Sequence, residues 1–214
     1  MAKNADRRWK KTSKHPEVEK AALEACRHPH IVSLLEVDGP NLWLEWLEGP
    51  TLAQKTVSQP LSILEAEKCA AELLDTVRFI HAAGWLHNDI SPQNIIWTSS
   101  GVVLVDFDAA TPADHADGLP MLGTIHYMAP ERLAGDPPSI ASDLYSLGIT
   151  LYEALTSQLP YNATTKAQII TAHHRHLFTP IEKVRRDLPQ SLISIVGRLT
   201  SRQPCDRMSD YATP

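Results

Sequence analysis

Apolar residues repeat along this chain in two ways, which predict different elements. Long stretches with apolar residues at helical spacing, or bounded by helix start and stop signals, predict helices at 16–26, 62–83, 141–156, 164–176 and 189–200. Short apolar runs between turn residues predict strands at 31–35, 42–47, 95–97 and 102–105. The first two strands flank the turn Asp38–Asn41, so we expect a hairpin there. After residues 48–50 the pattern is mainly helical.

Local signals define the ends of two of these helices. Pro16 is a favourable first helical residue, and His28 with the following proline ends that helix. Ser62 and Glu65 form a capping-box pattern in front of a long amphipathic stretch. Gly84 then ends this second helix, as glycine commonly does.

Composition is typical of a globular protein of one or two domains. The chain has 214 residues, of which 43% are hydrophobic and 21% charged. A formal net charge of -5 argues against nucleic-acid binding. No apolar run approaches the roughly 18–20 residues that span a bilayer, so we expect no membrane segment.

Cysteine usage and the first residues bear on location. The three cysteines are scattered and odd in number, which fits a reducing cytoplasm better than a disulfide framework. Residues 1–14 are basic and have no apolar core of a secretory signal, so we expect a solvated end. The histidines of the run 173–176 lack a clear metal-ligand spacing, and we expect them at the surface.

The richest chemistry lies in two neighbouring segments, His87–Asn94 and Asp106–Asp108. Asp89 can accept a proton from an attacking hydroxyl, and the oxygens of Asn94 and Asp106 can hold metal ions against phosphate groups. Oxygen ligands of this kind suit Mg²⁺. The spacing therefore predicts phosphoryl transfer from a Mg-nucleotide.

These two segments resemble the catalytic loop and the metal-binding DFG element of the eukaryotic-like serine/threonine protein kinases. Further resemblances follow in the same order as in that family: Gly123–Glu131, Asp143–Gly148 and Pro204–Arg207. In the family the last segment supplies an Arg that pairs with the glutamate at position 131. The resemblance implies one α+β kinase domain over 1–214, with a small β-rich amino-terminal lobe (1–47) and a mainly helical lobe (48–214).

The resemblance also implies residues around the nucleotide. Glu19 matches the helix glutamate that pairs with a phosphate-contacting lysine, for which we take Lys10, with Lys11 as the alternate. Glu45 and Leu47 would face adenine through backbone groups, and Ile96 would lie beneath it. The column that connects the lobes in the family would consist of four side chains: Leu23, Leu34, His87 and Phe107.

Four features depart from the family pattern. Asn88 replaces an Arg that pairs with a phosphorylated activation loop, so we expect activity independent of such phosphorylation. Ser91 replaces a common Lys, and Asp108 replaces the usual glycine. No glycine precedes Gly39, so the glycine-rich phosphate cover is missing. We expect a truncated chain, a reduced lobe or a partner chain that completes it.

The function predicted from these residues is ATP- and Mg²⁺-dependent phosphorylation of Ser or Thr in a protein substrate. Two alternatives stay open. A pseudokinase would keep the same residues as a binding or regulatory module. A small-molecule phosphotransferase, of the aminoglycoside type, would share the catalytic loop but lack the peptide-docking segment at 123–131.

Overall fold

The computed structural model describes residues 7–114 and 123–208. The basic residue Lys3 and the predicted loop residues 115–122 lie outside these ranges. In chain order the elements are β1 Arg8–Thr12, α1 Pro16–Ala25, β2 Leu34–Asp38, β3 Asn41–Glu45, α2 Leu52–Thr56, α3 Ile63–Ala82, β4 Trp85–Leu86, the 3₁₀ turn η1 Pro92–Asn94, β5 Ile95–Trp97, β6 Val102–Leu104, β7 Thr111–Pro112, α4 Pro130–Ala134, α5 Ile140–Thr156, α6 Lys166–His174, α7 Ile181–Val184, α8 Gln190–Leu199 and α9 Pro204–Arg207.

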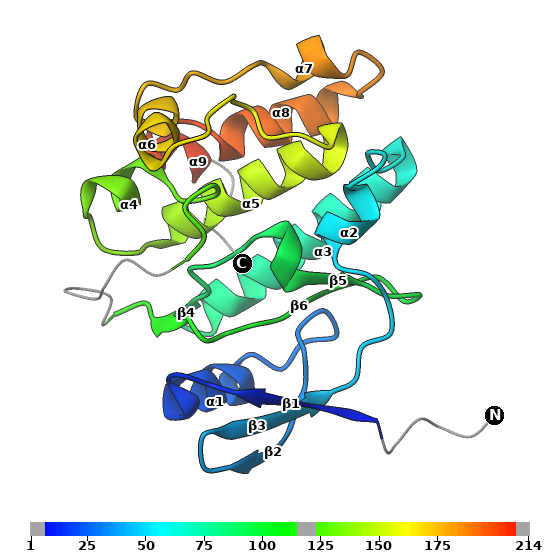
Figure 1. Ribbon diagram of the computed structural model, residues 1–214, viewed down its shortest axis with the longest axis vertical. Coiled ribbons are helices and arrows are strands. Elements are labelled where there is room, and N and C mark those ends of the chain that lie inside the picture. Colours follow the sequence, from blue (N-terminus) through cyan, green and yellow to red (C-terminus); the bar gives the residue numbers. More distant parts are fainter. Residues whose placement is uncertain (1–6, 115–122, 209–214) are drawn as a thin grey trace.

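The small lobe is an antiparallel sheet with α1 beside it, at one end of the molecule (Figure 1). Its strand order is β1-β3-β2, and Trp9 lies opposite Leu44 in the register of β1 with β3. Side chains alternate between the two faces of a strand, so Trp9 and Lys11 share one face of β1 while Arg8 and Lys10 share the other. The guanidinium of Arg8 lies 4.3 Å from the ring centroid of Trp43 on that second face.

Two expectations for this lobe need correction. The basic segment forms strand β1 because it completes the hydrogen bonding of β3, although Arg7, Arg8, Lys10 and Lys14 are exposed to solvent as expected. The strand expected at 31–35 begins later, at Leu34. Ile31 and Val32 are instead buried between the lobes, where the Val32 N–H donates to the carbonyl of Leu104 at 3.1 Å.

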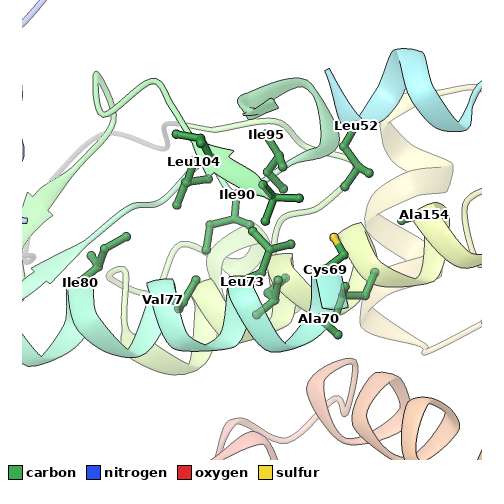
Figure 2. Packing of buried hydrophobic residues seen from close by; sticks show 14 of the residues in the cluster. Leu52, Cys69, Ala70, Leu73, Val77, Ile80, Ile90, Ile95, Leu104 and Ala154 are labelled. Carbon is green, nitrogen blue, oxygen red and sulfur yellow. The ribbon is translucent and has the colours of Figure 1, made fainter. Parts of the chain in front are cut away.

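The helical lobe is built on α3 and α5. As predicted, the Ser62 side chain accepts from the Glu65 N–H, and Glu65 accepts in return from the Ser62 N–H at 2.9 Å. Figure 2 shows the core that this helix covers. Leu73 and Val77 of α3 point toward side chains of the catalytic-loop region, β5 and β6. These are Ile90, Ile95 and Leu104, respectively.

Helix α5 runs through the middle of this lobe and is buried along most of its length. A Cβ atom on Gly148 would lie only 2.7 Å from the Cβ of Leu199, at the end of α8. Glycine therefore lets the two helices approach closely here, and a larger side chain would force them apart. The helices predicted at 141–156, 164–176 and 189–200 are present as α5, which begins one residue earlier, and as α6 and α8, which are slightly shorter.

Backbone contacts connect the two lobes. The Leu104 N–H in β6 donates to the His30 carbonyl at 2.8 Å, and Ile31 forms an isolated parallel β-bridge with Leu104. The α+β fold with a small β-rich lobe and a mainly helical lobe, expected from the sequence, is confirmed. In the described part of the chain, no helix combines the length and apolar character needed to cross a bilayer.

His173 is a further correction, because it is buried rather than at the surface. Its Nδ1 lies 2.7 Å from the Tyr145 hydroxyl, and the rings of Tyr161 and Phe178 pack around it. Burial lowers the pKa of His173 to about 3. The imidazole therefore stays neutral in the folded protein over most of the acidic range.

This neutral imidazole predicts a specific loss of stability in acid. An unfolded histidine titrates near 6.5, so below that pH the unfolded chain binds more protons and the free energy of unfolding decreases. The site contributes about 1.4 kcal/mol per pH unit. We expect His173→Gln to reduce the slope of unfolding free energy against pH by that amount between about pH 6 and pH 5.

Urea denaturation at several pH values measures this slope. The matched control is Tyr145→Phe, which removes the hydroxyl partner but keeps the titrating imidazole. It should lower stability and leave the slope unchanged. An unaltered slope in His173→Gln would show that His173 is not the titrating group.

Candidate active site

A buried carboxylate of α5 holds the backbone of the catalytic loop. Asp143 accepts hydrogen bonds from the N–H groups of His87 and Asn88, both at 2.8 Å, and lies 2.9 Å from His81 Nε2. Burial would raise the pKa of Asp143, but the His81 hydrogen bond and charge lower it. Asn88 adopts a left-handed backbone with φ of 65°. A charged anchor therefore supports a turn that few residues adopt.

Asp89 connects the catalytic loop with the segment that begins at Gly123. One of its oxygens accepts from both the N–H and the hydroxyl of Thr124, each at 2.8 Å. Its other oxygen accepts from the Asn94 amide at 3.0 Å. A Cβ on Gly123 would lie 2.5 Å from the Asn88 carbonyl oxygen, so glycine permits this close approach.

Asp106 and Phe107, which follow β6, differ in burial. Phe107 is fully buried, and its ring centroid lies 4.7 Å from that of His87. Leu23 is buried in the same core cluster, and Leu34 packs against it, so the four members of the predicted column belong to one core. His87 is a core residue, as predicted, and burial lowers its pKa. The Asp106 carboxylate stays partly exposed.

Lys11, not Lys10, pairs with Glu19, so the first choice of lysine was wrong. The Lys11 ammonium lies 2.6 Å from a carboxylate oxygen of Glu19 and 2.6 Å from one of Asp106. The alternation along β1 explains this, because Lys10 points to the other face, where its ammonium lies 5.7 Å from the Trp43 ring centroid. Burial would lower the pKa of Lys11, but the hydrogen bonds that its ammonium donates to Asp106 and Glu19 raise it. Lys11 is therefore a fixed positive charge between the lobes.

A cavity of about 330 Å³ lies beside this ion pair. The predicted residues Glu45, Leu47, Ile96, Asn94 and Asp106 all line it. Lys10 does not. A larger cavity, of about 490 Å³, lies behind α1 and contains none of the predicted catalytic or nucleotide-contacting residues.

Sequence reasoning missed Trp9, which lines the same cavity and is 45% exposed. The signal was present in the alternation of β1: a residue two positions before the buried lysine must share its face. Trp9 and Ile96 thus come from different lobes to the same cavity. An exposed indole in a cavity offers a flat surface on which a nucleobase can stack.

The donor set near Asp106 fits a magnesium ion. The Asn94 amide nitrogen donates to the Asp89 carbonyl and carboxylate, which leaves the amide oxygen as its metal-binding atom. Asp106 uses one oxygen for Lys11. Mg²⁺ usually takes only one or two protein ligands beside phosphate oxygens and water. Accordingly, the described residues contain no cluster of three or more His, Cys, Asp or Glu side chains that could hold a metal alone.

Ser91 and Asp108 lie in surroundings that the sequence did not predict. Ser91 is buried, so its side chain does not extend into solvent as the longer lysine of related proteins can. Asp108 accepts hydrogen bonds from the Ser13 hydroxyl at 2.7 Å and the Lys14 N–H at 2.9 Å. Burial would raise the pKa of Asp108, but these hydrogen bonds lower it.

The predicted pairing of Arg207 with Glu131 is confirmed. The two nitrogens of the buried guanidinium lie 2.6 Å and 3.0 Å from the two carboxylate oxygens. Arg207 also donates to the Ala141 carbonyl and lies over the ring of Tyr145. This bidentate pair ties the end of the chain to the segment that follows Thr124.

Comparisons with known proteins agree with this geometry. A family model described as "Protein kinase domain" matches residues 1–213. The probable serine/threonine-protein kinase PknB of Lactococcus lactis is 30% identical over 198 residues, which cover 88% of this chain and 32% of the relative. PrkC of Bacillus subtilis is 28% identical over 200 residues (88% and 31%), and Pkn1 of Myxococcus xanthus is 31% identical over 209 residues (91% and 30%). The chain thus spans about a third of these relatives' length.

The two neighbouring lysines provide a matched test of the site. Lys11→Met leaves the carboxylate of Glu19, which is 1% exposed, without its ion pair. We expect the free energy of unfolding to fall by about 3 kcal/mol, as when one member of a buried ion pair is removed. Lys10→Met removes an exposed charge and should change it by less than about 0.5 kcal/mol.

Urea denaturation at neutral pH measures both variants. Adding Glu19→Gln to Lys11→Met should recover part of the loss, because it removes the unpaired charge. Equal effects of the two lysine variants would contradict the assignment of Lys11.

Proposed function

Because the chain belongs to the protein kinase domain family, we propose that it transfers the γ-phosphoryl group of ATP, with Mg²⁺, to Ser or Thr hydroxyls of a protein substrate. The observation that carries the proposal is the position of Lys11, which contacts Glu19 and Asp106 beside a cavity of nucleotide size. The relatives named serine/threonine-protein kinases support the choice of acceptor. We also propose a lobe boundary at residues 47 and 48, and a cytoplasmic location in view of three free cysteines.

The nucleotide would enter the cavity lined by Trp9, Glu45, Leu47 and Ile96. Backbone groups of Glu45 and Leu47 would bond the adenine edge, with Ile96 below the base and Trp9 above it. Lys11 would contact the phosphates, and its charge would favour the α- and β-phosphate oxygens. Burial of the base between the two side chains would exclude water from both faces.

The hydroxyl of the substrate would lie beside Asp89. Its carboxylate would orient the hydroxyl and accept its proton as the oxygen attacks phosphorus. Asn94 and Asp106 would hold Mg²⁺, which would neutralise charge on the phosphate oxygens. Thr124 bonds the same carboxylate and would keep its orientation fixed while the peptide is bound. The main contribution of these residues is positioning and charge neutralisation.

The second candidate is a pseudokinase that binds nucleotide or partner proteins with little turnover. One observation favours little turnover: the lysine that commonly steadies the transferring phosphate is replaced by the buried Ser91. The segment Gly123–Glu131, secured through Thr124 and the Arg207 pair, argues for a protein ligand in either case.

Two aspartate variants separate binding from transfer. Saturating Mg·ATP at ~100 times Kd should stabilise the protein by about 2.7 kcal/mol. Asp106→Ala should abolish both this stabilisation and phosphoryl transfer. Asp89→Asn should keep the stabilisation but reduce transfer to Ser and Thr peptides by about 10²–10⁴-fold. Thermal unfolding and radiolabelled phosphate incorporation provide the two measurements.

The outcomes distinguish the candidates. Stabilisation of the unmodified protein without transfer would indicate the pseudokinase. Transfer to small alcohols or aminoglycosides, but not to peptides, would indicate a small-molecule phosphotransferase. If Mg·ATP neither stabilises the protein nor supports phosphoryl transfer, the proposed activity is ruled out.

Activity should not require phosphorylation of the activation segment. Asn88 cannot pair with a phosphate as the usual Arg does. The segment from Ala109 to Gly123 contains a single hydroxyl residue, Thr111, which is buried and accepts a hydrogen bond from Asn88. Protein treated with a phosphatase should retain full activity, and Thr111→Val should not mimic a dephosphorylated, inactive enzyme. Loss of activity after phosphatase treatment would contradict this prediction.

A further inference from the structure

Helix α1 carries Glu19 but has no cap from its own N-cap side chain. Its N-cap residue is His15, and the His15 side chain makes no capping hydrogen bond. The first N–H groups of a helix have no partner within the helix and are normally satisfied by such a side chain. The position of Glu19 therefore depends on what else holds this end of the helix.

Asp108, on the opposite side of the cleft, caps the segment that leads into this helix end, although it does not accept from the first N–H groups of the helix themselves. One of its carboxylate oxygens accepts from the Lys14 N–H at 2.9 Å and from the Ser13 hydroxyl at 2.7 Å. The Ser13 hydroxyl oxygen in turn accepts from the His15 N–H at 3.2 Å. Ser13 is buried, so this contact is shielded from solvent. A negative charge at this position also interacts favourably with the helix dipole.

The Asp106–Asp108 turn is also joined to the ion pair that Lys11 forms with Glu19 and Asp106. The Asp108 N–H lies 3.4 Å from the Asp106 oxygen that accepts from Lys11. Lys11 is two residues before Ser13 on the chain and also bonds Glu19. The contacts form a closed ring through β1, α1 and the Asp106–Asp108 turn, so a shift at one contact displaces the others.

On its other side the turn is fixed to the catalytic loop by neutral groups. The Asn88 amide donates to the Ala109 carbonyl and to the Thr111 hydroxyl, both at 2.9 Å. These bonds hold the start of the activation segment without any added phosphate. The two residues that depart from the family pattern, Asn88 and Asp108, thus lie on either side of one turn.

We propose that Asp108 is a positioning residue: its carboxylate caps the entry to α1, at Ser13 and Lys14, from across the cleft and keeps Glu19 and Lys11 aligned with Asp106. The glycine usual at this position has no side chain and could not make these bonds. The consequence for catalysis rests on the proposed kinase function, whereas the capping itself does not.

Hydrogen exchange of the α1 amides tests the cap without reference to activity. In Asp108→Ala and in Ser13→Ala, the Lys14 N–H and the amides of α1 should exchange about tenfold faster, because an unanchored entry lets this end of the helix open locally. The double variant should exchange no faster than Asp108→Ala, since both changes break one unit. Asp108→Asn keeps an accepting oxygen and should recover part of the protection.

The control is Asp187→Ala, which removes an exposed aspartate paired with Arg185 in the other lobe. It should leave α1 unchanged. If Asp108→Ala does not fold, Ser13→Ala tests the same contact, since it removes only the hydroxyl that donates to Asp108. Unchanged exchange of α1 in Ser13→Ala and in any folded Asp108 variant would overturn the proposal.

Kinetics test the consequence for the nucleotide site. If loss of the cap leaves the aligned state only partly populated, nucleotide affinity falls by that fraction while the bound enzyme turns over normally. We expect Asp108→Ala to raise the KM for Mg·ATP about tenfold with kcat within about twofold. A large loss of kcat at unchanged KM would contradict this role. Absence of activity in the unmodified protein would refute the proposed function. The hydrogen-exchange result would still show whether Asp108 holds the entry to α1.

Discussion

The ammonium of Lys11 is the interaction on which the geometry of this site depends. It contacts Glu19 on a helix of the small lobe and Asp106 at the end of a strand of the other lobe. Because Glu19 is buried, its charge is tolerable only while this contact exists. The position of α1, the closure of the cleft and the orientation of Asp106 are therefore set together, by one charge.

A second buried charge gives the other lobe its rigidity. Asp143 lies on α5, the most buried helix, and fixes two consecutive N–H groups of the catalytic loop. The loop can then hold Asn88 in a left-handed conformation and present Asp89 between Asn94 and Thr124. A carboxylate that accepts several hydrogen bonds in the interior is strongly oriented, and it transmits that orientation to the loop.

The departures from the family pattern gain physical meaning from their contacts. Asn88 replaces a charged link to a phosphate by two neutral hydrogen bonds to the activation segment. Asp108 adds a link to the small lobe that glycine could not make. Trp9 adds an aromatic surface to the cavity beside Asp106. Together these residues describe a site whose alignment is built in by hydrogen bonds and packing.

Sequence patterns predicted the five longest described helices, and motif order placed Asp89 and Asn94 in one loop and paired Arg207 with Glu131, because helical spacing is local and the motifs are strongly patterned. The sequence could not decide between Lys10 and Lys11. That choice depends on which face of β1 meets the cleft, and the pairing of β1 with β3 sets it. The cap from Asp108 was also beyond sequence reasoning, since its atoms are 94 and 95 residues from their partners. Only the packing of the two lobes brings such distant groups within hydrogen-bond distance.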